Sequence, residues 1–135
     1  MARISRARRS LEKLRNIVET PWDEYRVNED LQALAERHLH IVLESILDLA
    51  AFIAARKGVS RGPSYREVVE SIIYANIVPR KYSDILLAVP GMRNILVHGY
   101  AEIRHDIIYD TLRNELDKFM DLVRILWGEA EKLDP

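Results

Sequence analysis

Apolar residues recur along this chain at steps of three and four positions, the spacing that gathers side chains on one face of an α-helix. The first such run is Ile4, Ala7, Leu11, Leu14 and Val18. The Thr20-Pro21 pair follows it and predicts a stop, because a residue before proline avoids the helical backbone region. We therefore predict a first helix with one buried stripe.

A second, longer run extends from Asn28 to about Lys57. Its inward positions are Leu31, Leu34, Ala35, His38, Ile41, Val42, Ser45, Ile46, Leu49 and Ile53. Gly58 follows and is a suitable helix stop, because glycine readily adopts the left-handed conformation that ends many helices. This segment is predicted to be the longest helix.

Two shorter helices are predicted after the loop over residues 58–63. Ser64 with Glu67 three positions later forms a capping-box pattern that begins a helix ending near Ala75. Pro79 opens the next helix. The Pro90-Gly91 pair should kink or break it, since proline lacks the backbone N–H that a helix interior needs.

A last helix is predicted from about Asp106 to Trp127, with Gly128 after it. Its apolar stripe is Ile108, Leu112, Leu116, Phe119, Val123 and Leu126. No segment of the sequence shows the alternation typical of strands. Amphipathic helices with short connections predict an all-α fold, an antiparallel bundle of four to five helices, in one domain over residues 1–135.

Composition narrows the function classes. The 135 residues suffice for one hydrophobic core. Cysteine is absent, which excludes disulfides, a thiol nucleophile and thiolate metal sites and favours a cytoplasmic location. The apolar stretch from Ile46 to Ala55 contains Asp48 and is much shorter than the roughly 20 residues of a membrane span, so no membrane association is expected.

The net charge of −1 conceals a basic N-terminal segment. Residues 1–15 contain one acidic residue, Glu12, and six basic ones: Arg3, Arg6, Arg8, Arg9, Lys13 and Arg15. Such a segment is able to follow a phosphate backbone. Solvated or ion-paired arginines on a surface helix are the more common explanation, so the segment gives only weak support for nucleic-acid binding.

The candidate chemistry lies in M-R-N-I-L-V-H-G-Y, residues 92–100, which gathers Arg93, Asn94, His98 and Tyr100. A guanidinium neutralises a phosphate and an imidazole transfers protons near neutral pH, so Arg93 and His98 suit phosphodiester cleavage. Five positions on an unbroken helix correspond to about 140° of rotation, which points the two side chains apart. Their convergence therefore requires a distorted helix or a second copy of the chain.

A purely structural role fits the same residues. His98 would then bond a carbonyl at a helix end, and Arg93 would pair with an acid. Elsewhere, His38 and His40 lie about 200° apart on their helix and cannot share a metal ion, so we expect His38 in the core and His40 in solvent. No cofactor and no metal ligands are predicted.

The segment R-N-I-L-V-H-G-Y resembles the R-x4-H-x-Y signature of HEPN-domain proteins, and specifically of the HepT toxin family. The helix L-Q-A-L-A-E-R-H-L-H-I-V-L-E-S-I-L-D-L-A, the S-Y-R-E helix start and the A-E-I after Tyr100 are similar to that family as well, so the resemblance spans roughly residues 28–127. Pro90 departs from the family pattern.

The resemblance implies an HEPN-like bundle that forms a homodimer and shares one cleft between two copies of the motif. It also implies cleavage of RNA, with transfer RNA as a candidate substrate, without a metal ion. Arg93 would stabilise the scissile phosphate, His98 would act as general acid or base, and Asn94 would support them. Tyr100 would be the tyrosine to which an MntA-like nucleotidyltransferase antitoxin adds AMP, placing negative charge where RNA must bind. The alternative is a non-catalytic HEPN subunit that binds nucleotide or serves as a scaffold for a nucleotidyltransferase.

Overall fold

The computed structural model describes residues 2–99 and 103–133, and side chains from Ile4 onward in these ranges. The described residues form helices and loops and no strand, as the sequence predicted. The helices are α1 (Ala2–Ile17), α2 (Trp22–Tyr25), α3 (Glu29–Lys57), α4 (Tyr65–Tyr74), the 3-10 turn η1 (Arg80–Tyr82), α5 (Ser83–His98) and α6 (His105–Leu133).

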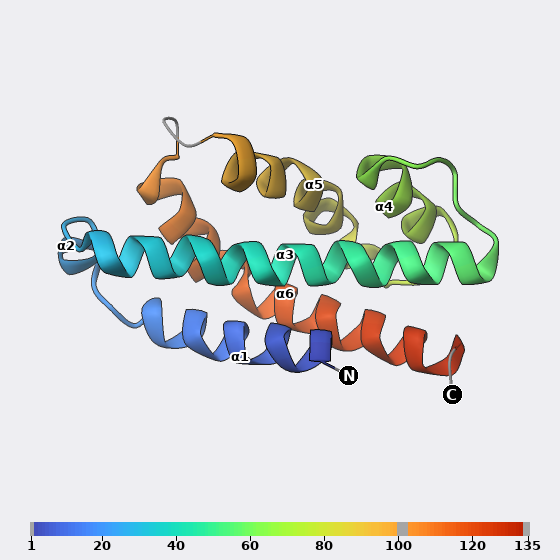
Figure 1. Ribbon diagram of the computed structural model, residues 1–135, viewed down its shortest axis with the longest axis horizontal. Helices are drawn as coiled ribbons and strands as arrows, with labels where there is room; N and C mark the ends of the chain where they lie inside the picture. The colour runs from blue at the N-terminus through green and yellow to red at the C-terminus, as the bar shows by residue number, and fades with distance from the viewer. Residues whose placement is uncertain (1, 100–102, 134–135) are drawn as a thin grey trace.

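The five longer helices form the predicted bundle (Figure 1). α3 and α6 pack against each other through the middle of the molecule, and α1 packs against both. α4 and α5 cover the other side of α3 and also contact each other. α1 and α5 both run against α3, whereas α6 runs in the same sense as α3 (Figure 1).

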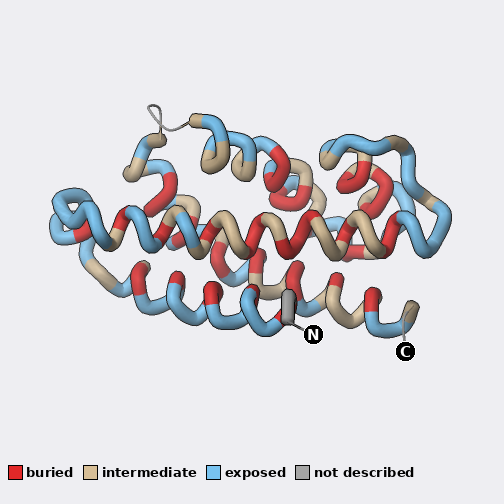
Figure 2. The backbone as a smooth tube through the Cα atoms, viewed as in Figure 1, coloured by how far each residue is buried: buried red, intermediate tan, exposed pale blue. Residues whose placement is uncertain are grey.

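The core lies where these helices face one another, and buried positions repeat along the inner side of each helix (Figure 2). Burial of one large aliphatic side chain contributes roughly 1.5–3 kcal/mol. By length and composition alone α3 could cross a membrane. Its apolar character is accounted for by the core, because its buried side chains contact helices on both sides.

Three of the predicted helix boundaries are confirmed. The Asn28 side chain accepts a hydrogen bond from the Leu31 N–H at the start of α3. Ser64 and Glu67 form a complete capping box at the start of α4. Gly58 ends α3 in the left-handed conformation with φ +66°, where an L side chain would be strained.

Pro90-Gly91 was predicted to kink or break its helix, and the break does not occur, because α5 is continuous from Ser83 to His98. Pro90 is buried, and its contact with the core offsets the hydrogen bond that its ring removes. Likewise α6 continues through Gly128 to Leu133, because Ala130 in the next turn is buried. α6 is therefore as long as α3.

The single turn α2 was not predicted from the sequence. It anchors the chain reversal between α1 and α3 through Tyr25, which is fully buried. The Tyr25 ring lies 4.9 Å from the Tyr109 ring of α6, and the Trp22 ring lies 5.3 Å from the same ring. Aromatic contacts of this kind stabilise by about 0.5–1.5 kcal/mol per pair.

Candidate functional site

Arg93 of α5 is held by a carboxylate from α3. Its Nε donates a hydrogen bond of 2.7 Å to Glu44 Oε1. The same oxygen lies 3.2 Å from His40 Nε2, one helical turn earlier on α3. Both ends of the Arg93–Glu44 pair are partly buried, with 23% and 28% of their side chains exposed. This position makes the pair stronger than an ion pair in open solvent.

The rest of the guanidinium remains oriented but accessible. Its Nη1 donates a hydrogen bond to Asn94 Oδ1 at 3.3 Å, and its central carbon, Cζ, lies 5.5 Å from the centre of the Tyr65 ring. Among the described residues no group accepts a hydrogen bond from Nη2. Arg93 is thus fixed through Nε and presents the other side of its fork to a ligand. A phosphate binds a guanidinium on such a face.

The two charges of the pair stabilise each other. Burial alone raises the pKa of Glu44, but the hydrogen bonds from Arg93 and His40 and their positive charges outweigh it, and the net pKa is lowered. The hydrogen bond to Glu44 raises the pKa of Arg93 further above its ordinary value. At neutral pH the site therefore contains a carboxylate and a guanidinium in contact.

His98 is the last residue of α5 and is exposed. Within the described part of the chain its ring makes no hydrogen bond or ion pair. The backbone turns directly after it, where the Gly99 N–H donates to the Ile95 carbonyl oxygen at 2.8 Å. A Cβ at Gly99 would lie 2.7 Å from that oxygen, so a larger residue would displace the turn.

The candidate residues are not all brought together within one chain. Because α5 is an unbroken helix, Arg93 and His98 lie about 140° apart around its axis. Asn94 is exposed beside Arg93. Tyr100, predicted as the modified residue, lies outside the described residues. The structure contains no helix break that would turn His98 toward Arg93.

Glu44 is the site residue that the sequence analysis missed. It lies 49 positions from Arg93, and its only local signal is its place one turn after His40. His40, expected in solvent, is only partly so: 41% of its side chain is exposed, and its ring also contacts Glu44. His38 is partly buried and bonds the Ser10 hydroxyl of α1 at 3.0 Å, which is a packing role.

Two other features bear on ligands. The described residues contain no group of three or more histidines and acids placed to hold a metal ion. Beside the His98 end of α5, an apolar cavity opens between α3, α5 and α6, with Met92, Leu96 and Ile108 in its wall. Ile95 and Ile107 also line it, and both remain more than half exposed.

Comparisons with known proteins agree on a family and a fold. The family described as "Ribonuclease HepT-like" matches residues 7–126. The mRNA nuclease HepT of Shewanella oneidensis is 27% identical over 86 residues, which covers 64% of this chain and 65% of that protein. The match thus spans just under two thirds of that relative's length.

Solved structures extend the likeness of fold to nearly the whole chain. The tri-AMPylated HEPN toxin of Shewanella oneidensis, in complex with an MNT antitoxin, has a TM-score of 0.82 at 21% identity, covering 94% of this chain and 95% of that one. A toxin–antitoxin structure with AMP-PNP has a TM-score of 0.79 at 21% identity, covering 93% and 95%.

Proposed function

This chain belongs to the HepT-like ribonuclease family, and from that premise we propose that it is an RNA-cleaving toxin in which Arg93 and His98 are the catalytic residues. The observation that supports this most directly is the orientation of Arg93. Glu44 holds its Nε and Asn94 contacts its Nη1, while Nη2 has no acceptor among the described residues and is open to a phosphate.

The proposed reaction is transesterification of the RNA backbone. One imidazole removes the 2′-hydroxyl proton, and the 2′-oxygen attacks the adjacent phosphorus. The bond from phosphorus to the 5′-oxygen breaks, and a second imidazole gives that oxygen a proton. The products are a 2′,3′-cyclic phosphate and a 5′-hydroxyl, while Arg93 stabilises the charge on the phosphate in the transition state.

This reaction needs two histidines, and the helix geometry supports their coming from two copies of the chain. Arg93 and His98 diverge on one continuous helix, whereas a second copy brings its own motif to the same cleft. The exposed Ile95 and Ile107 provide apolar surface beside His98 for such a contact. We therefore propose a homodimer with one shared site.

The test is RNA cleavage by purified protein in EDTA. Cleavage is expected without added metal, since the arginine and the histidines supply charge stabilisation and proton transfer. Arg93→Ala and His98→Ala should each reduce cleavage at least 100-fold, in line with the typical contribution of one acid–base or oxyanion group. Arg80→Ala and His105→Ala, matched changes outside the motif, should cleave like the wild type.

Circular dichroism must show the same helix content for all four variants. Cleavage that requires magnesium would reject the metal-independent reaction. Cleavage that survives both motif changes would reject the roles of Arg93 and His98. A wild type that does not cleave RNA would instead favour the alternative of a non-catalytic subunit.

We further propose that a nucleotidyltransferase antitoxin silences the toxin in the cytoplasm by transferring AMP to the Tyr100 hydroxyl. The phenol oxygen would attack the α-phosphate of ATP, with pyrophosphate as leaving group. Supporting this, one of the solved structures with a similar fold is a tri-AMPylated HEPN toxin in complex with an MNT antitoxin. Each added AMP brings negative charge to the motif and competes with RNA phosphate for Arg93.

Intact mass spectrometry after coexpression with such a nucleotidyltransferase tests the modification. AMP-sized increments should appear on the wild type and be absent from Tyr100→Phe. Tyr74→Phe, which changes an exposed tyrosine on α4, should be modified like the wild type. Increments that persist in Tyr100→Phe would reject Tyr100 as the acceptor.

A further inference from the structure

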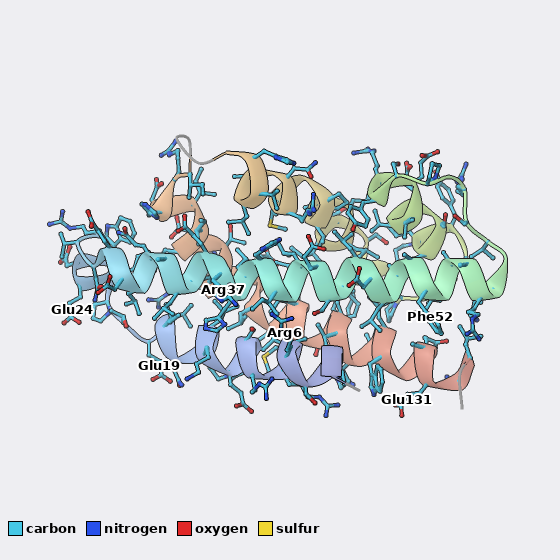
Figure 3. All side chains as sticks on the ribbon, viewed as in Figure 1. Arg6, Glu19, Glu24, Arg37, Phe52 and Glu131 are labelled. Atoms are coloured by element: carbon cyan, nitrogen blue, oxygen red, sulfur yellow. The ribbon has the colours of Figure 1, made fainter. Side chains whose placement is uncertain are left out.

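A polar groove runs between α1 and α3 next to the Arg93 site. Arg6 lines it from α1, and Arg37, His40, Glu44 and Asp48 line it from α3. The cavity measures about 290 Å³, at the lower end of the range for pockets that bind small molecules. Figure 3 shows the labelled Arg6 and Arg37 side chains at the boundary between the two helices.

The two arginines of this groove are free to bind a ligand. Arg6 and Arg37 are exposed, and among the described residues neither has an ion pair or a side-chain hydrogen bond. Arg15 and Arg124, by contrast, pair with aspartates of α6. Within the basic N-terminal segment, the structure thus separates Arg15, which has a partner, from Arg6, which has none among the described residues.

The two carboxylates that line the groove already have interactions of their own. Glu44 is engaged by Arg93 and His40, and Asp48 has an interaction of its own.

Glu44 connects the groove to the candidate site, because it lines the groove and also holds Arg93. A strand with one phosphate at Arg93 therefore has its neighbouring phosphates close to the groove. We propose that Arg6 and Arg37 form a subsite for backbone phosphates of the RNA strand beside the cleavage point, an inference that rests on the proposed ribonuclease function. Such contacts fix the path of a strand without reading its sequence.

Binding of a fluorescently labelled single-stranded RNA, measured by anisotropy in the His98→Ala background, tests the subsite. The variant Arg6→Gln/Arg37→Gln should bind about 10-fold more weakly at 0.1 M salt. The slope of log affinity against log salt should fall by about 1.4, since each phosphate contact on a single strand contributes about 0.7.

A matched variant isolates the effect of position from that of charge. Arg8 and Arg124 line a groove on the other side of α1, between α1 and α6. Arg8→Gln/Arg124→Gln removes the same two charges and should change the salt slope by less than half as much.

The outcomes separate the subsite from the function itself. Equal loss in both double variants, or no loss in either, while wild type cleaves RNA, overturns the subsite and leaves the ribonuclease in place. If Arg6→Gln/Arg37→Gln binds RNA like the wild type but no longer binds a nucleotidyltransferase, the groove is a protein contact, and the subsite proposal is overturned as well. A wild type that neither binds nor cleaves RNA overturns both proposals.

Discussion

At the scale of single residues, the site depends on a contact that local sequence patterns cannot reveal. Arg93, Asn94 and His98 stand out because they are close together in the sequence. Glu44 comes from another helix and meets Arg93 only after folding. Glu44 lies one helical turn after His40, and this spacing suggests a pair between these two residues. It does not show that Arg93 joins them. The charges of the motif were thus predictable, whereas the group that orients Arg93 was not.

Replacing Glu44 by glutamine should lower stability in a manner that depends on pH. The glutamine retains the shape but loses the charge that binds Arg93. We expect the free energy of unfolding at pH 7 to fall by about 1 kcal/mol, near the lower limit for hydrogen bonds to charged groups because the pair is partly exposed. Urea denaturation of both proteins at several pH values measures this difference.

The sign of the pH effect follows from the lowered pKa of Glu44 in the folded protein. The stabilisation is present above its ordinary value of 4.5 and is lost as the pH falls through the lower folded value. Wild type and Glu44→Gln should therefore converge in acid. Glu19→Gln, at an exposed residue, is the control and should match the wild type throughout. A gap for Glu44→Gln of equal size at pH 3 and pH 7 contradicts the ionic role.

At the scale of helices, the sequence predicted beginnings better than ends. The caps at Asn28 and Ser64 were predictable because their hydrogen bonds reach only three residues along the chain. The continuation of α5 through Pro90 and of α6 through Gly128 depends on packing against other helices. Taken alone, proline and glycine tend to interrupt a helix, and the sequence pattern predicts only this tendency. In α5 and α6 the contacts with other helices outweigh it.

Two glycine substitutions test this distinction between local and tertiary effects. Gly128 lies within α6, and an added Cβ meets no atom within 4 Å. Gly128→Ala should raise stability by about 0.5–1 kcal/mol, because alanine loses less backbone freedom on folding. Gly58 has equal space but φ +66°, so Gly58→Ala should lower stability by about 1 kcal/mol. Thermal unfolding followed by circular dichroism compares the stabilities of the two variants. Effects of the same sign would contradict the conclusion that backbone conformation, and not space, distinguishes Gly58 from Gly128.

At the scale of the whole molecule, the bundle leaves its chemistry incomplete. One face of α5 directs Arg93 toward α3, and the helix end carries His98 into solvent beside exposed isoleucines. A second chain that covers this apolar surface would bring another His98 to the cleft. The 140° divergence predicted either a distorted helix or a second copy, and it did not identify the surface through which a second copy would bind.

An acidic substitution on that surface should dissociate the proposed dimer. Ile107→Glu places a charge at a residue that is 53% exposed in the single chain, where assembly would bury it without a partner. Light scattering at micromolar concentration should find a dimer for the wild type and a monomer for this variant. Val27→Glu, at another exposed apolar residue, should remain dimeric. A dimeric Ile107→Glu would place the interface elsewhere.

The shared site is tested most directly by mixing wild-type and His98→Ala chains. The two are unfolded together in urea, refolded at different ratios, and assayed for RNA cleavage in EDTA at constant total protein. Because the proposed reaction requires one histidine from each chain, activity should fall with the square of the wild-type fraction, to about one quarter at an equal mixture. Activity proportional to the wild-type fraction, or one half at that mixture, would show that a single chain completes its own site and would contradict the account.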